Sequence, residues 1–118
     1  MLTPTARLAK NLEASIEAKR MLLSDAALLS AFDEATMMLV GRYERGGRIY
    51  IAGNGGSAAD SQHLAAEFVS RLARDRNPLP AEALTVDSSI LTAIGNDYGY
   101  DQIFARRIAG KATEKDVF

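Results

Sequence analysis

The stretch IAGNGGSAADSQHLAAEF, residues 51–68, decides the fold of this chain. The short apolar run RIYIA (48–52) meets a glycine-rich turn, and a helical pattern follows from about Ser57 to Arg74. β-Branched and aromatic residues bounded by turn residues are typical of a buried strand. Glycine allows a tight connection to the next element. The sequence therefore predicts a strand, a turn and a helix in direct succession.

The flanking sequence extends this pattern in both directions. Apolar residues recur at helical spacing over 5–23, and a second helix is expected from Ser24 or Asp25 to the Gly46-Gly47 pair. Further along, we expect a strand at 82–86, a helix at 88–96 interrupted at 96–100, a helix at 101–110, and a third strand beginning at DVF. Two helices followed by β-α-β-α-β indicate an α/β fold with a parallel sheet.

Length and composition are those of one globular domain. The chain has 118 residues, 47% of them apolar, and a net charge of −1, so no general attraction to nucleic acid or anionic membranes is expected. The absence of cysteine excludes disulfides and thiolate metal sites. No apolar run reaches the ~18 residues of a membrane helix, and no signal peptide is recognisable. These features predict a cytoplasmic protein.

The turn GNGGS (53–57) lies between a strand and a helix, where α/β proteins bind ligands. The N–H groups and positive dipole end of a helix N-terminus attract anions. The glycines would let a phosphate approach the backbone, and Ser57 adds a hydroxyl donor. The sequence matches neither the GxGxxG fingerprint nor a P-loop. An ordinary glycine turn with Ser57 as helix cap remains the alternative.

Four polar residues fall on one face of the helix that follows. Asp60, His63, Glu67 and Arg71 form a narrow stripe at about 100° per residue. His63 and Glu67 are one turn apart, and imidazole with carboxylate at that spacing suits Zn²⁺. The alternative is a solvated helix face, because a catalytic zinc needs three protein ligands and the chain has no second histidine.

A third polar segment, GNDYGY (95–100), follows the second predicted strand. Asn96 and Asp97 are expected near the same edge of the sheet as the glycine turn, where they would hydrogen-bond substrate hydroxyls. Asn-Asp is also common in simple turns, so turn formation is the alternative interpretation.

Taken together, these motifs resemble those of the phosphoheptose (sedoheptulose 7-phosphate) isomerases, which belong to the sugar isomerase (SIS) domain proteins. The resemblance rests on AGNGGSAADSQHLAAEF, on FVSRL and on DSSILTAIGNDYGY, and covers essentially the whole chain. It implies an SIS-type, flavodoxin-like doubly wound sheet preceded by two helices, with about the first three strands present. The expected organisation is one C-terminally incomplete domain (1–118), with helices in 1–46 and the β-α-β-α-β part in 47–118.

The resemblance also implies roles for individual residues. The positions matching Asn54, Gly55, Gly56 and Ser57 contact the sugar phosphate in the family. Those matching His63 and Glu67 bind zinc, and the one matching Glu67 also contacts substrate and serves in acid/base catalysis. Those matching Asn96 and Asp97 contact substrate, while Asp60 and Arg71 match positions lining the site.

The implied activity is conversion of D-sedoheptulose 7-phosphate to D-glycero-D-manno-heptose 7-phosphate for lipopolysaccharide or other surface glycans, by a homotetramer. Such a reaction moves a proton between C1 and C2 through an enediolate. The family's remaining zinc ligands and second phosphate loop would follow residue 118, so the 118-residue chain alone is expected to be inactive.

Two other functions fit the same family. One is a non-catalytic SIS protein that binds the bacterial replication initiator, and the other is a sugar-phosphate-binding regulator or an isomerase of smaller sugar phosphates. The His63–Glu67 pair favours an enzyme, because a pure binding module has no need of it. The two leading helices and the HLAAE spacing favour the heptose substrate.

Overall fold

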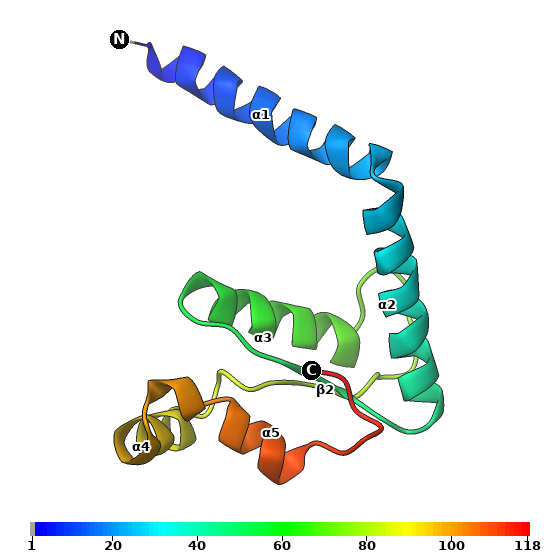
Figure 1. Cartoon of the computed structure of the whole chain (residues 1–118), viewed down its shortest axis with the longest axis vertical. Coiled ribbons are helices and arrows are strands. Elements are labelled where there is room, and N and C mark those ends of the chain that lie inside the picture. The colour runs from blue at the N-terminus through cyan, green and yellow to red at the C-terminus, as the bar shows by residue number, and fades with distance from the viewer. Residues whose placement is uncertain (1) are drawn as a thin grey trace. The chain divides into compact units, whose positions relative to one another are not determined.

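The structure is a computed structural model that describes residues 2–118 (Figure 1). It divides into two compact units, one ending at Met38 and one spanning Leu39–Phe118. Helix α1 (Pro4–Ser24) lies in the first unit, and α2 (Ala26–Glu44) continues from the first into the second. The two helices predicted from the apolar spacing are therefore present.

Side-chain caps explain where these helices begin. The Thr3 hydroxyl accepts a 3.2 Å hydrogen bond from the N–H of Ala6, and Pro4 occupies the first helical position, where its missing N–H costs nothing. Asp25 separates the helices, and its carboxylate accepts hydrogen bonds of 3.0 and 3.1 Å from the N–H groups of Ala27 and Leu28. Asp25 is thus the cap that the sequence suggested.

The second unit contains the alternating elements. In chain order they are β1 (Ile49–Ile51), α3 (Gly56–Val69), β2 (Ala81–Ala83), α4 (Ser88–Tyr98), the 3₁₀ turn η1 (Tyr100–Gln102) and α5 (Ala105–Lys111). Strands β1 and β2 are parallel, with Ile49 opposite Ala81 and Ile51 opposite Ala83. The parallel sheet expected from the β-α-β pattern is confirmed.

The end of the chain lies on the other side of β1. Val117 forms an isolated parallel bridge with Ile49, and Tyr50 donates a 2.8 Å hydrogen bond to the Val117 carbonyl. The third strand predicted at DVF is therefore a single bridge among the described residues. Since the chain moves to one side of β1 through α3 and to the other through α4 and α5, β1 lies at the point where the sheet changes direction.

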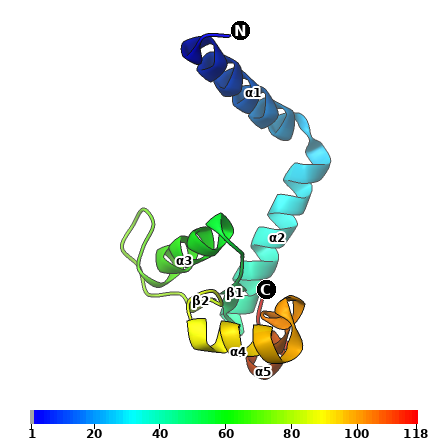
Figure 2. The same ribbon diagram turned by 90° about the vertical axis from the view of Figure 1, so that its left-hand side faces the viewer.

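Helices cover both faces of these strands. Figures 1 and 2 show α3 on one face and α4 and α5 on the other, the arrangement of a doubly wound α/β fold. The core between the layers is small and centres on Leu84, which is completely buried. Its other buried apolar residues are Tyr50, Ala65, Ala83 and Ile103.

Helix α3 ends five residues earlier than the sequence pattern predicts. It stops at Val69, and Ser70 has φ −88° and ψ −100°, outside the helical region. The Arg76 guanidinium donates hydrogen bonds to two of the last carbonyls of α3, at 2.7 Å to Glu67 O and 2.8 Å to Phe68 O. The prediction of helix to Arg74 was wrong because a returning side chain satisfies these carbonyls.

Three other boundaries differ from the expectation. Helix α4 continues through 96–98 and ends at Gly99, whose φ of 100° favours glycine and stops the helix. The helix predicted at 101–110 is split into η1 and α5. Strand β2 occupies 81–83 instead of 82–86, because the chain turns at Leu84–Thr85 toward α4.

Candidate functional site

The turn after β1 brings the backbone unusually close to the start of α3. A Cβ on Gly53 would lie 2.5 Å from the carbonyl oxygen of Ser57, which no side chain tolerates without a backbone shift. Gly55 has φ 56° and ψ −122°, a conformation that L-residues rarely adopt. Two of the predicted turn glycines are thus required by the backbone itself.

This turn presents several hydrogen-bond donors at one helix end. The N–H of Ser57 bonds the Asn54 carbonyl at 3.0 Å, and that of Ala58 bonds the Gly55 carbonyl at 3.1 Å. Four further donors make no hydrogen bond to another group within residues 2–118. They are the backbone N–H groups of Gly55 and Gly56, the side-chain amide nitrogen of Asn54 and the hydroxyl of Ser57. Such a cluster at the positive end of a helix suits an anion.

A cavity of about 320 Å³ opens beside the turn. Asn54 and Gly55 line it from the β1–α3 turn, and Thr85 and Tyr100 line it from the segments after β2 and α4. The Thr85 hydroxyl lies 3.3 Å from the Ala58 carbonyl, so its proton is engaged by the backbone. The other lining residues are Gly53, Ala58, Leu91, Thr92, Gly95, Ile103 and Phe104.

Its position agrees with the topology of the sheet. The Asn54 turn follows the carboxyl end of β1, the strand with neighbours on both sides. In open α/β sheets, ligands bind outside the carboxyl ends of strands where the chain direction reverses. The cavity therefore has the location of a ligand site, and two of the donor residues, Asn54 and Gly55, line it.

His63 and Glu67 face each other along α3. Nε2 of His63 lies 3.3 Å from Oε1 of Glu67, and their side chains are 79% and 26% exposed. Two ligand atoms bound at about 2.0–2.1 Å to one tetrahedral Zn²⁺ are also about 3.3 Å apart. The pair thus fits two corners of a zinc site, while residues 2–118 contain no group of three His, Cys, Asp or Glu placed to bind a metal.

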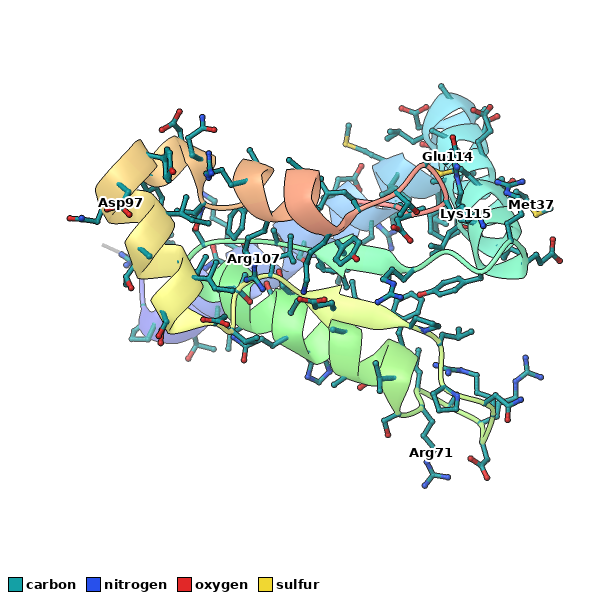
Figure 3. The ribbon with its side chains drawn as sticks, turned by 90° about the horizontal axis from the view of Figure 1, so that it is seen from below. Met37, Arg71, Asp97, Arg107, Glu114 and Lys115 are labelled. Carbon is teal, nitrogen blue, oxygen red and sulfur yellow. The ribbon has the colours of Figure 1, made fainter. Side chains whose placement is uncertain are left out.

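The remaining predicted residues are more scattered. Asn96 and Asp97 are exposed in the last turn of α4, where Asn96 Nδ2 donates a 2.9 Å hydrogen bond to Asp97 Oδ1, and neither lines the cavity. Arg71 lies beyond the end of α3, so the predicted four-residue stripe is wrong at its last member. Figure 3 shows Arg71 and Asp97 at opposite ends of the unit, while Asp60 is exposed on α3.

Sequence reasoning missed the hydroxyl residues of the cavity, Thr85, Thr92 and Tyr100. Tyr100 belongs to the GNDYGY segment, from which the sequence predicts only Asn96 and Asp97 as substrate-binding groups. The signal was Gly99, which ends α4 and sends the chain back toward the sheet. An aromatic residue directly after a helix-ending glycine was the available clue.

Comparison with known proteins shows which family the chain belongs to. The SIS-domain family profile matches residues 16–118. A phosphoheptose isomerase from Aneurinibacillus thermoaerophilus is 48% identical over 108 residues, which are 92% of this chain and 54% of that protein. Another from Roseiflexus sp. is 54% identical over 107 residues, or 90% of this chain and 53% of that protein.

Solved structures show the same likeness. Phosphoheptose isomerase from Neisseria gonorrhoeae superposes with a TM-score of 0.85 at 38% identity, covering 97% of this chain and 58% of that one. The enzyme from Francisella tularensis gives 0.88 at 36% identity, covering 98% and 59%. The chain spans about half the length of the relatives that it matches. The resemblance to phosphoheptose isomerases and the doubly wound fold are thereby confirmed, and the chain belongs to the SIS-domain family.

Proposed function

We propose that the protein is a ketose–aldose isomerase that converts D-sedoheptulose 7-phosphate to D-glycero-D-manno-heptose 7-phosphate. The observation that carries this proposal is the identity of about half to phosphoheptose isomerases over some nine tenths of the chain. The cavity beside the Asn54 turn supports it, because its helix-end donors suit a phosphate.

In this function the phosphate of the sugar binds at the start of α3. The N–H groups of Gly55 and Gly56, the amide of Asn54 and the hydroxyl of Ser57 are its donors. Holding the phosphate fixes the distance from that end of the sugar to the carbons that react, and this removes the entropic cost of alignment. Asn96 and Asp97, in the last turn of α4, are the proposed partners of the sugar hydroxyls.

Glu67 is the proposed acid/base group. Its carboxylate is less exposed than the imidazole of His63. A carboxylate held within hydrogen-bond reach of a substrate proton can act as a general base. Glu67 would take a proton from C1, next to the C2 carbonyl, to give an enediolate. The hydroxyl proton on O1 then moves to the oxygen on C2, and Glu67 returns its proton to C2, so that C1 becomes the aldehyde carbon. No atom is gained or lost in the exchange.

We further propose that His63 and Glu67 hold Zn²⁺. Their nitrogen–oxygen donor set and 3.3 Å separation fit two tetrahedral positions, and other ligands complete the shell. A metal ion held there supplies positive charge that stabilises a developing oxyanion. The chain's own contribution is to place the two ligands one turn apart on a helix that is anchored to the sheet.

The assembly and setting follow from the same resemblance. We propose a homotetramer in the cytoplasm that makes heptose for lipopolysaccharide or related surface glycans, and that engages neither nucleic acid nor membranes. Exposed apolar side chains along α1, among them Leu8, Leu12 and Leu23, support self-association. No helix within residues 2–118 has the length and hydropathy to cross a bilayer.

The decisive experiment is a substrate panel. Purified full-length protein with zinc is incubated separately with sedoheptulose 7-phosphate, fructose 6-phosphate and ribulose 5-phosphate, and aldose formation is followed by NMR. Turnover of the heptulose phosphate at least about 100-fold above the others is expected, because each misplaced contact costs about 1–3 kcal/mol. Absence of turnover with zinc-loaded protein would refute the function, and binding without turnover would favour a regulator.

A further inference from the structure

Tyr100 lines the cavity of the candidate site, but the proposed reaction assigns it no role. Its hydroxyl donates a 2.7 Å hydrogen bond to Oδ1 of Asn54, which is 46 positions away in the sequence. Both residues line the same cavity. The contact therefore links the segment after α4 to the turn after β1 across the mouth of the site.

The backbone explains why Tyr100 reaches this turn. Gly99 has φ 100° and ψ 154°, and this conformation, rarely adopted by L-residues, ends α4 and redirects the chain. Tyr100 begins η1, and Ile103, directly after η1, is 4% exposed and anchors it in the core. Figure 1 shows η1 and the β1–α3 turn at the same end of the second unit.

The hydrogen bond determines which way the Asn54 amide faces. A carboxamide has one accepting oxygen and one donating nitrogen, and rotation by about 180° exchanges them. Because Tyr100 engages Oδ1, the Nδ2 group with its two protons is directed elsewhere and bonds no other residue within 2–118. An anion at the start of α3 then meets a donor instead of a repelling oxygen.

The other hydroxyls in the cavity do not provide this control. Thr92 donates to the Ser88 carbonyl at 2.7 Å, and Thr85 to the Ala58 carbonyl at 3.3 Å. Both hydroxyls thus donate to helix carbonyls, and neither forms a hydrogen bond with Asn54. Tyr100 is the residue within 2–118 whose side chain hydrogen-bonds the Asn54 side chain.

We propose that Tyr100 is a positioning residue, whose hydroxyl holds the Asn54 amide with Nδ2 toward the bound phosphate. The nature of the natural ligand, a sugar phosphate, rests on the proposed function. The positioning effect itself applies to any phosphate monoester or inorganic phosphate at the turn, and this allows the two ideas to be tested separately.

The first experiment needs no catalysis. Tyr100→Phe removes only the hydroxyl. Tyr98→Phe is the matched control, because Tyr98 does not line the cavity and its ring centroid lies 3.7 Å from the Arg106 guanidinium carbon. Inorganic phosphate is titrated while the side-chain amide signal of Asn54 is followed by ¹H–¹⁵N NMR. Tyr100→Phe should shift that signal and weaken phosphate binding about five- to tenfold, and Tyr98→Phe should do neither.

A second pair of variants separates positioning from simple damage. In an Asn54→Ala background, Tyr100→Phe should cause no further loss, because the group that it orients is already gone. Equal thermal midpoints of wild type and Tyr100→Phe exclude a folding defect as the cause. Fully additive losses, unchanged phosphate affinity in Tyr100→Phe, or a wild type that binds no phosphate would each overturn the proposal.

Kinetics provide the third test. With sedoheptulose 7-phosphate, Tyr100→Phe should raise KM about five- to tenfold with kcat within about twofold, as expected when binding common to substrate and transition state is lost. A fall in kcat at unchanged KM would contradict positioning of a phosphate donor. If the full-length wild type does not turn over this sugar, the proposed function fails, and the phosphate titration still decides the role of Tyr100.

Discussion

His63 and Glu67 have the same spacing as many surface pairs, but their surroundings are unequal. The His63 side chain is 79% exposed, whereas that of Glu67 is 26% exposed and belongs to the helical turn that Arg76 closes. A metal ligand needs only an accessible lone pair, while a catalytic carboxylate also benefits from partial shielding. This difference supports the proposed division of roles, in which both residues would bind zinc and Glu67 would transfer the proton.

Replacing Glu67 or His63 should therefore change turnover or zinc binding. Glu67→Gln keeps the shape but removes the base, and we expect kcat to fall about 100- to 10,000-fold. His63→Ala should weaken zinc by more than about 100-fold, beyond the usual effect of a supporting residue. Zinc content by mass spectrometry and turnover are measured together, with the exposed neighbour Gln62→Ala as control. Full activity in Glu67→Gln would contradict the assigned role.

Asp116, near the C-terminal end of the sequence, makes the stability of the fold depend on pH. Its carboxylate accepts hydrogen bonds from the N–H of Thr113 at 2.7 Å and of Arg48 at 2.9 Å. The Thr113 bond, followed by that of Arg48, lowers the pKa of Asp116 below its usual 3.8 against the opposing effect of desolvation. The folded state thus binds this proton less readily than the unfolded state.

The resulting stability is present above the usual pKa of the carboxyl and is lost as the pH falls through its lower folded value. Asp116→Asn should lower the urea midpoint at neutral pH, and the difference from wild type should shrink below about pH 3.8. Asp75→Asn, an exposed carboxyl without a hydrogen bond within 2–118, is the control. A difference independent of pH would rule out this linkage.

At the level of elements, the end of α3 is held by Arg76 and Tyr43, and Tyr43 is also bonded to the segment before β2. Arg76 bonds its last carbonyls, the Phe68 ring stacks on Tyr43 with centroids 6.1 Å apart, and the Tyr43 hydroxyl donates a 3.0 Å hydrogen bond to Pro80 O. Burial raises the pKa of Tyr43, opposed by the nearby charge of Arg76. The helix that presents His63 and Glu67 is thereby joined to α2 and to the start of β2.

Removing the Arg76 contact should loosen this end of α3. We expect Arg76→Ala to lower the free energy of unfolding by about 1 kcal/mol, since the bonds are charged but exposed. Amide hydrogen exchange should rise in residues 66–69 before it rises in β1. Arg76→Lys should restore part of the loss, and Arg74→Ala should have no effect. Unchanged exchange in Arg76→Ala would show that the Phe68–Tyr43 stacking and the 3.1 Å hydrogen bond from the Leu79 N–H to Phe68 O suffice to hold the helix end.

The turn after β1 requires glycine at position 53. Gly53→Ala would bring its Cβ to 2.5 Å from Ser57 O, so the turn or the helix start must move. We expect a loss of about 1–3 kcal/mol in stability, typical of forced overpacking, together with weaker phosphate binding. Gly56→Ala is the matched control, because nothing lies within 4 Å of its Cβ position. Equal stability of the two variants would contradict the close approach.

At the level of the whole molecule, the first unit has little core of its own. None of the described residues of α1 or α2 is buried, and large apolar side chains such as Leu12, Ile16 and Phe32 are about half exposed or more. Apolar surface of this extent is unusual for a monomer. It is consistent with the proposed homotetramer.

Light scattering on the purified protein tests this assembly directly. We expect a tetramer, and we expect Leu12→Lys to dissociate it because a charge would enter an apolar interface. Glu13→Lys changes the charge on the adjacent polar side of α1 and should leave the assembly intact. A monomeric wild type across a broad range of concentrations would refute the proposed oligomeric state.

Local chemistry in the sequence determined most elements and the turn at the site. Apolar spacing predicted the helices, β-branched residues predicted β1, and the glycines marked the turn, because these signals act between near neighbours. The same patterns placed His63 and Glu67 on one helix face, and the structure agrees. The family resemblance was likewise carried by contiguous motifs.

The tertiary structure alone decided the features that depend on distant residues. Arg76 ends α3 before Arg71, Val117 joins β1 from 68 positions away, and Tyr100 reaches Asn54 across 46. These contacts form only when separate elements meet in space, and they follow no spacing rule within the sequence. The sequence by itself therefore predicted candidate residues for binding a phosphate or a metal, because residue type and near-neighbour spacing are local properties. Packing decided which residues share a cavity and which way they face, because these contacts join distant parts of the chain.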